Sequence, residues 1–142
     1  MPAWRRKLSQ MISTLEIRNF KSIKQLKLDC RRINILIGEP NTGKSNILET
    51  LGIFSFVAYY AGDDFRDFVR YERMSNLFYD ENLDEPILIQ PNNISLTFRF
   101  DRGRFEGRIY NKDGQLAELS GDYNNLDIID VRRGELYPFK SY

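Results

Sequence analysis

The stretch "RINILIGEPNTGKSNILET", residues 32–50, decides the fold of this chain. Its centre has the form G-x-x-x-x-G-K-[ST], the Walker A pattern of a phosphate-binding loop, with Gly38, Gly43, Lys44 and Ser45 at the fixed positions. Glycines let the backbone turn its N–H groups inward around an anion. The lysine supplies a positive charge for the β- and γ-phosphates, and the serine hydroxyl can complete a Mg²⁺ shell. The pattern therefore predicts a nucleotide phosphate site, with Ser45 as the metal ligand.

Apolar residues flank this loop on both sides. Residues 33–37, "INILI", form an apolar run that only Asn34 interrupts, which is typical of a strand buried on both faces. After the loop, apolar residues recur at helical spacing at Ile47, Leu48, Leu51, Phe54 and Val57. A helix that begins at about Gly43 directs its positive N-terminal end at the bound phosphates. Strand, loop and helix thus follow one another in the order that a phosphate-binding loop requires.

Composition limits both the chemistry and the location of the chain. With 142 residues, of which 42% are hydrophobic, the chain is about one domain. The sequence has no histidine, which excludes histidine general bases and histidine-ligated zinc, and its single cysteine fits a reducing compartment. No run reaches the roughly 18 apolar residues of a membrane span, and residues 1–10 do not lead into a secretory signal. We therefore expect a cytoplasmic protein with no membrane partner.

The segments around the loop predict further strands and a short helix. Residues 12–37 predict three strands, separated by turns at "NFKS" and "DCRR". Past the loop helix, Gly62 is the predicted C-cap, and Asp63 or Asp64 is predicted to cap a short second helix.

From residue 94 onward the apolar pattern changes to period two. In "NISLTFRFD", residues 93–101, apolar and polar side chains alternate strictly, and "RFEGRIY" repeats the alternation after a "DRG" turn. "NKDG" makes a second turn, and "LDIIDV", residues 126–131, is a candidate for one more strand. The pattern predicts an antiparallel meander with one solvated face.

Basic residues gather in the first part of the chain. Nine of them precede residue 33, against only Glu16 and Asp29, and such an excess fits a nucleic-acid partner. The alternative is a two-stranded ribbon with a solvated polar face. Strand alternation favours this alternative, because four polar residues, Glu16, Arg18, Gln25 and Lys27, alternate with Leu15, Ile17, Leu26 and Leu28.

Residues 12–54, "ISTLEIRNFKSIKQLKLDCRRINILIGEPNTGKSNILETLGIF", resemble the N-terminal lobe of the ABC-type ATPases of the RecF/SMC/OLD group, often catalogued as AAA-family ATPases. In that group a strand ends in Asn-Phe-Lys/Arg-Ser, and an apolar strand then leads into G-x-N-x-x-G-K-S-N. Here "NFKS" is residues 19–22, and Asn46 follows the serine of the loop. Asn41 falls one position later than the usual asparagine. The resemblance implies an ATP–Mg²⁺ site formed by Gly38, Asn41, Thr42, Gly43, Lys44, Ser45 and Asn46, with Lys21 and Ser22 close to the nucleotide.

The same resemblance implies motifs that this chain does not contain. Hydrolysis in the group needs a Walker B segment ending in Asp-Glu and a Leu-Ser-Gly-Gly signature that acts on a second protomer's nucleotide. "LSGDY", residues 119–123, and "LDIID", residues 126–130, mimic these two motifs. We interpret both as ordinary turn and strand, because "LSGDYNN" is rich in turn residues and Val131 stands where a glutamate is needed.

The sequence thus predicts an α/β fold of the P-loop NTPase type, a mixed sheet with the loop helix and an antiparallel meander. Residues 1–11 are expected to be an N-terminal extension, and residues 12–142 the incomplete N-terminal part of an ABC-type ATPase domain. The expected function is ATP binding without hydrolysis by this chain alone. The complete protein is expected to be an ATP hydrolase linked to DNA repair or phage defence, which dimerises through its ATPase heads and contacts DNA. A stand-alone nucleotide-binding regulatory module, or a P-loop kinase or GTPase of another class, are the alternatives.

Overall fold

The computed structural model describes residues 11–40, 42–59, 62 and 64–132 of the chain. Over these residues it contains one α-helix, three short 3₁₀ helices and a seven-stranded sheet. In chain order the elements are β1 (Thr14–Phe20), β2 (Ile23–Asp29), α2 (Lys44–Tyr59), η1 (Phe65–Asp67), η2 (Met74–Leu77), η3 (Tyr79–Glu81), β3 (Ile87–Pro91), β4 (Ser95–Asp101), β5 (Arg104–Asn111), β6 (Gly114–Gly121) and β7 (Leu126–Val131).

The strands form one continuous sheet in the order β2-β1-β3-β4-β5-β6-β7. Every pairing between these strands is antiparallel. The predicted meander is confirmed, because β4 to β7 follow one another as neighbouring strands, including the candidate strand at residues 126–131. Parallel pairings, which a mixed sheet would also contain, do not occur among the described strands.

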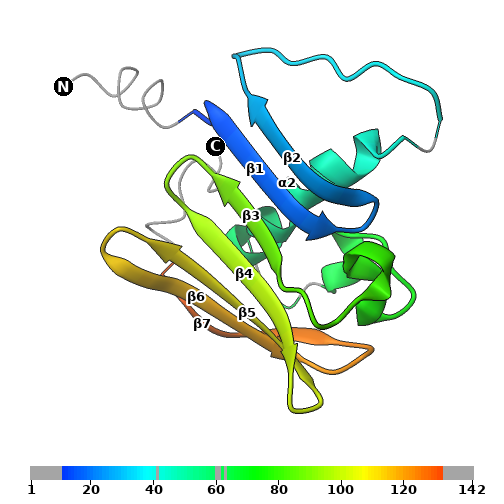
Figure 1. The fold of residues 1–142 in the computed structure, drawn as a ribbon. Helices are drawn as coiled ribbons and strands as arrows, with labels where there is room; N and C mark the ends of the chain where they lie inside the picture. The colour runs from blue at the N-terminus through cyan, green and yellow to red at the C-terminus, as the bar shows by residue number, and fades with distance from the viewer. Residues whose placement is uncertain (1–10, 41, 60–61, 63, 133–142) are drawn as a thin grey trace.

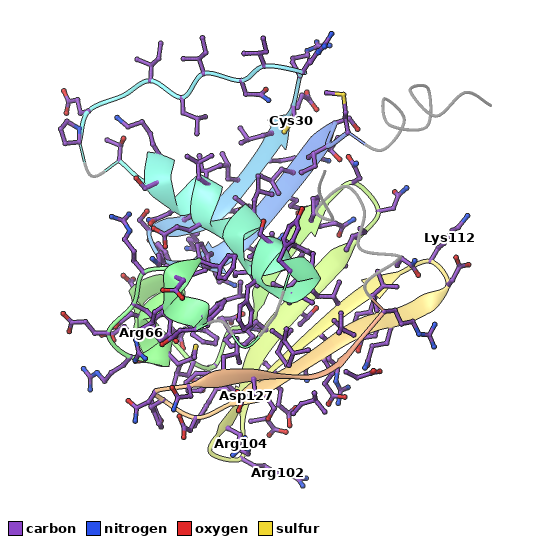
Figure 2. All side chains as sticks on the ribbon, turned by 180° about the vertical axis from the view of Figure 1, so that it is seen from behind. Cys30, Arg66, Arg102, Arg104, Lys112 and Asp127 are labelled. Atoms are coloured by element: carbon purple, nitrogen blue, oxygen red, sulfur yellow. The ribbon has the colours of Figure 1, made fainter. Side chains whose placement is uncertain are left out.

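Helix α2 packs on one face of the sheet, and the core lies between them (Figure 1). Seen from behind, the helix crosses in front of the strands, with side chains filling the space between the layers (Figure 2). Phe54, Phe56 and Val57 of the helix are fully buried, as are Ile17 and Ile89 of the sheet. The α/β character predicted from the sequence is therefore present as a helix layer on a sheet layer.

The predicted buried strand at residues 33–37 is wrong for the structure described here. These residues belong to none of the seven strands, and Figure 1 shows the segment between β2 and α2 as a wide arc away from the sheet. The side chains of Ile33, Ile35 and Ile37 are 79%, 78% and 90% exposed. A continuous apolar run predicts a doubly buried strand only if both faces and both edges find partners, and the described strands supply none.

The exposure of this segment also explains why the prediction of the buried face of α2 is partly wrong. Leu48 was predicted to lie on the buried face but is 62% exposed, while Glu49 and Thr50 are buried. Leu48 and residues 33–36 line the same open, largely apolar hollow. The helix therefore buries a face that is rotated from the predicted one, and its apolar remainder faces the uncovered segment.

The β1–β2 hairpin confirms the two-stranded ribbon that was predicted to carry Glu16, Arg18, Gln25 and Lys27 on its polar face. Leu15 pairs with Leu28 and Ile17 with Leu26, while Glu16 pairs with Lys27 on the other face. Leu15 and Ile17 are buried, Leu26 and Leu28 are half-buried, and Lys27 is exposed. On this polar face Arg18 Nη2 lies 2.6 Å from a carboxylate oxygen of Glu16.

The short second helix predicted after α2 is a single 3₁₀ turn. Asp64 caps it, because its Oδ1 accepts a hydrogen bond of 2.9 Å from the backbone N–H of Arg66. Gly62, the predicted C-cap, has the expected positive φ of 86°, although α2 ends at Tyr59. Asp63 lies outside the described residues.

Candidate nucleotide-binding site

The glycine-rich loop, residues 38–45, runs from the exposed segment into the first turn of α2. Lys44, the first residue of the helix, folds its ammonium group back over the loop. Its Nζ donates to the backbone carbonyl oxygen of Gly38, and to that of Glu39 at 2.9 Å. Thr42 also donates from its hydroxyl to the Glu39 carbonyl oxygen, at 2.8 Å. Hydrogen bonds to the Gly38 and Glu39 carbonyl oxygens thus hold the Lys44 ammonium group against the described part of the loop.

The turn of the β1–β2 hairpin meets the beginning of α2. Gly43 has φ of 93°, a backbone conformation that side chains rarely adopt, and a Cβ atom placed there would lie 2.8 Å from Ser22 Oγ. Asn46 Nδ2 donates to the same Ser22 Oγ at 2.7 Å. The glycine is therefore required by its backbone conformation, and Ser22 packs against it.

These residues surround an open hollow of about 330 Å³ at the N-terminal end of the helix. It is lined by Ser22, Thr42, Gly43, Lys44, Ser45, Asn46 and Arg70. Two of the described lining residues are cations and none is a carboxylate. Hydroxyls, an amide, two cations and a helix N-terminus are donors suited to an anion.

The structure brings together most of the residues predicted for the site, but not all of them. Five of the seven residues predicted within 38–46, namely Thr42, Gly43, Lys44, Ser45 and Asn46, line the hollow, and Ser22 joins them from the hairpin turn. Gly38 does not line the hollow, but its carbonyl oxygen accepts a hydrogen bond from Lys44 Nζ. Asn41 lies outside the described residues. Lys21 does not line the hollow, because its Nζ donates to Glu49 and to the Arg70 carbonyl oxygen.

Glu49 and Arg70 form a charged cluster beside the hollow that the sequence did not reveal. Oε1 of Glu49 lies 2.9 Å from Nε and 2.8 Å from Nη2 of Arg70, and Oε2 accepts from Lys21. Burial alone would raise the pKa of the Glu49 carboxyl, but hydrogen bonds from Lys21 and Arg70 outweigh burial and lower that pKa. Glu49 is therefore an ionised carboxylate shared between two cations. The sequence carries no signal for this cluster, since its members lie 21 and 28 residues apart.

The two segments that mimic hydrolysis motifs lie in the meander. Leu119 and Ser120 are in β6, and residues 126–130 are in β7, where Asp130 pairs with Glu118. β7 is the edge strand opposite β2, the other edge of the sheet. The strand predicted for the second segment is confirmed, whereas in the first segment residues 119–121 belong to β6 and only the residues after Gly121 form the predicted turn.

Comparison with known proteins identifies the family. Residues 11–126 match the AAA ATPase domain family. This match covers most of the chain. The chain belongs to this family. The glycine-rich loop therefore lies within an AAA ATPase domain. The resemblance to RecF-like ATPases predicted this family.

Individual relatives of this AAA ATPase domain match over 29–43% of the chain. The DNA replication and repair protein RecF of Staphylococcus epidermidis is 31% identical over 62 residues, 43% of this chain and 17% of its own length. An ATP/GTP phosphatase of Helicobacter pylori is 48% identical over 42 residues, 29% of this chain and 11% of its own length. An uncharacterised protein of Methanocaldococcus jannaschii is 49% identical over 45 residues, 31% of this chain and 20% of its own length. The matched segment thus spans a fifth or less of each of these relatives.

Membrane insertion through a helix finds no support in the described part of the chain. There, α2 is the only α-helix, and it is too short for a helix that crosses a bilayer.

Proposed function

We propose that this AAA ATPase domain binds ATP with Mg²⁺ in the hollow at the N-terminal end of α2. The observation that carries the proposal is the convergence of Lys44, Ser45 and Asn46 with the hairpin residue Ser22 around one opening. Lys44 would exchange its two carbonyl acceptors for the β- and γ-phosphates, and the Ser45 hydroxyl would be a Mg²⁺ ligand. Loop N–H groups and the helix N-terminus add partial positive charge.

Lys44→Ala tests this site. Charge-assisted hydrogen bonds contribute about 1.5–3 kcal/mol, so we expect ATP affinity to fall by roughly 10- to 100-fold. The fold should persist, because the hydrogen bonds of the Lys44 ammonium group to described residues go to carbonyl oxygens of its own loop. Titration of both proteins with ATP–Mg²⁺, monitored by calorimetry, measures the effect. Ser45→Ala should instead remove mainly the part of the affinity that depends on Mg²⁺. Equal affinity of the wild type and Lys44→Ala would exclude this site.

We also propose that this chain by itself does not turn over ATP. Phosphoryl transfer needs an oriented nucleophile and a metal held from more than one side, and no described lining residue is a carboxylate. We expect phosphate release by residues 1–142 to be the same for the wild type and for Lys44→Ala. Release that is lost in Lys44→Ala would contradict the proposal and would direct attention to Asp130.

A role in DNA transactions is proposed for the whole protein rather than for this domain alone. Its support is the likeness to a protein named for DNA replication and repair, together with the exposed Lys24 and Lys27 on the hairpin. We propose DNA repair or phage defence as the biological process of the whole protein. We also propose that its ATPase heads pair as a homodimer. Loss of duplex DNA binding at raised salt concentration would be the expected electrostatic signature.

A further inference from the structure

The segment between β2 and α2, which arcs away from the sheet in Figure 1, presents three isoleucines to solvent. Ile33, Ile35 and Ile37 are each more than three-quarters exposed, whereas Leu36 is 37% exposed. Within the described part of the chain, no backbone group of residues 33–37 takes part in a backbone hydrogen bond. Both the side chains and the backbone of this run are therefore available to a partner.

Opposite charges border the run at equal distances from its centre. Arg31 and Glu39 each lie four residues from Ile35, one before it and one after it. Both side chains are exposed, and neither forms an ion pair with another described residue. Residues 31–39, here named the apolar arc, thus have a cation at one end, an anion at the other and an isoleucine at the centre. A second copy in reversed orientation presents the complementary charges.

Hydrogen bonds hold both ends of the apolar arc in place. At its start, the Asn34 side chain accepts from the backbone N–H of Arg31 at 2.9 Å and donates to the Arg31 carbonyl oxygen at 2.8 Å. At its end, the Glu39 carbonyl oxygen accepts from Lys44 Nζ at 2.9 Å and from the Thr42 hydroxyl at 2.8 Å. A segment held at both ends loses less conformational entropy when it binds.

An open, largely apolar hollow of about 360 Å³ lies beside the apolar arc. Its lining includes Leu36 of the arc, Leu28 of β2 and Leu48 of α2, which is 62% exposed. Asp29 is the only charged residue among the described residues that line it. The hollow therefore adds apolar surface beside the arc, and the charges that can select a partner are those at the two ends of the arc.

We propose that the apolar arc is a self-association surface through which two copies of this chain form a closed dimer. The two arcs meet in antiparallel orientation about a two-fold axis at Ile35. Each Arg31 then faces Glu39 of the other copy, and each Ile33 faces Ile37. A contact that uses the same surface on both copies closes with two members. This surface includes none of the residues that line the nucleotide hollow, so the proposal goes beyond nucleotide binding and does not depend on it.

The charges select the antiparallel orientation over the parallel one. In a parallel contact in register, Arg31 would face Arg31 and Glu39 would face Glu39, and like charges that meet at an interface disfavour it. The antiparallel contact replaces both repulsions by attractions. The same isoleucines are buried in either case, so the ends of the arc decide the arrangement.

Sedimentation velocity over a range of chain concentrations, at low salt and without nucleotide, tests the dimer. We expect a monomer–dimer equilibrium for the wild type. Ile35→Asp should raise its dissociation constant by roughly tenfold or more, since two carboxylates would meet in an apolar contact at the axis. The fold should persist, because Ile35 belongs to none of the described helices or strands. A wild type that stays monomeric at every attainable concentration, as it would if another part of the chain covered the arc, overturns the proposal.

Ile129→Asp is the matched control. It places the same charge at an isoleucine that is 61% exposed but lies on β7, outside the apolar arc. We expect the dissociation constant of this variant to equal that of the wild type. Equal weakening by Ile35→Asp and Ile129→Asp would show association through exposed apolar side chains in general, and the apolar arc would not be the interface.

Charge reversal tests the antiparallel arrangement. Arg31→Glu and Glu39→Arg should each raise the dissociation constant by roughly three- to tenfold, because each variant brings like charges together at two places in the dimer. The double variant restores opposite charges and should recover the wild-type value. These differences should shrink at high salt, where exposed charges are screened. Additive losses in the double variant, or assemblies larger than dimers in the wild type, would overturn the two-fold arrangement.

Discussion

Among the residues that the structure describes, Glu49 is the charged residue that the fold buries, with 8% of its surface exposed. A buried carboxylate is costly unless it is paired and hydrogen-bonded, and both conditions hold here through Lys21 and Arg70. These contacts join α2, the hairpin turn and the segment after η1. The same side chain therefore serves the stability of the domain and the shape of the site.

The stability of the domain should depend on pH through Glu49. Its pKa is lower in the folded protein than the ordinary value of about 4.3 for glutamate. The contribution of Glu49 is therefore complete above pH 4.3, where the carboxyl is ionised in both states, and is lost as the pH falls through the lower folded-state pKa. Urea unfolding of the wild type and Glu49→Gln should show a difference of about 1–3 kcal/mol at pH 7, which narrows in acid. A difference that stays constant down to pH 3 would contradict this assignment.

At the scale of secondary-structure elements, the meander and the 3₁₀ region share a cluster of aromatic rings. Phe105 of β5 is fully buried, and its ring centroid lies 4.8 Å from that of Phe100 and 5.8 Å from that of Phe78. It also meets the Tyr123 ring edge-on at 5.3 Å. Phe105 thus connects strands β4 and β5 to the 3₁₀ region and to the turn before β7.

Phe105→Ala should destabilise the domain by roughly 3–5 kcal/mol, because it removes apolar surface and leaves a cavity among rings. Phe100, which is only half-buried, offers a matched control, and Phe100→Ala should cost less. Chemical unfolding monitored by far-ultraviolet circular dichroism measures the free energy of unfolding of both variants. Equal losses for the two variants would show that burial does not decide the contribution of these rings.

For the molecule as a whole, the local sequence pattern predicted those elements whose structure depends on neighbouring residues in the chain. The meander, the hairpin and α2 follow from apolar periodicity, and the residues of the glycine-rich loop that line the hollow follow from a short motif. Arg70 could not be predicted in this way, because its place depends on the passage of residues 68–70 over Gly52. The prediction of a buried strand at residues 33–37 is wrong for a related reason. Their pattern reports an affinity for buried surroundings, and whether such surroundings exist depends on the rest of the molecule.

The uncovered run at residues 33–37 has a consequence for the association of copies of this chain, which we expect it to promote. A net charge of +1 supplies little mutual repulsion, and three isoleucine side chains that are each more than three-quarters exposed supply a local attraction. Short, uncharged, β-prone segments associate with their own copies. In colloidal terms, residues 33–37 give the described part of the chain an attractive patch outside its sheet, and we expect this patch to lower the solubility of the chain. Conditions that strengthen burial of apolar surface, such as high sulfate concentrations, should stabilise the core and promote clustering together.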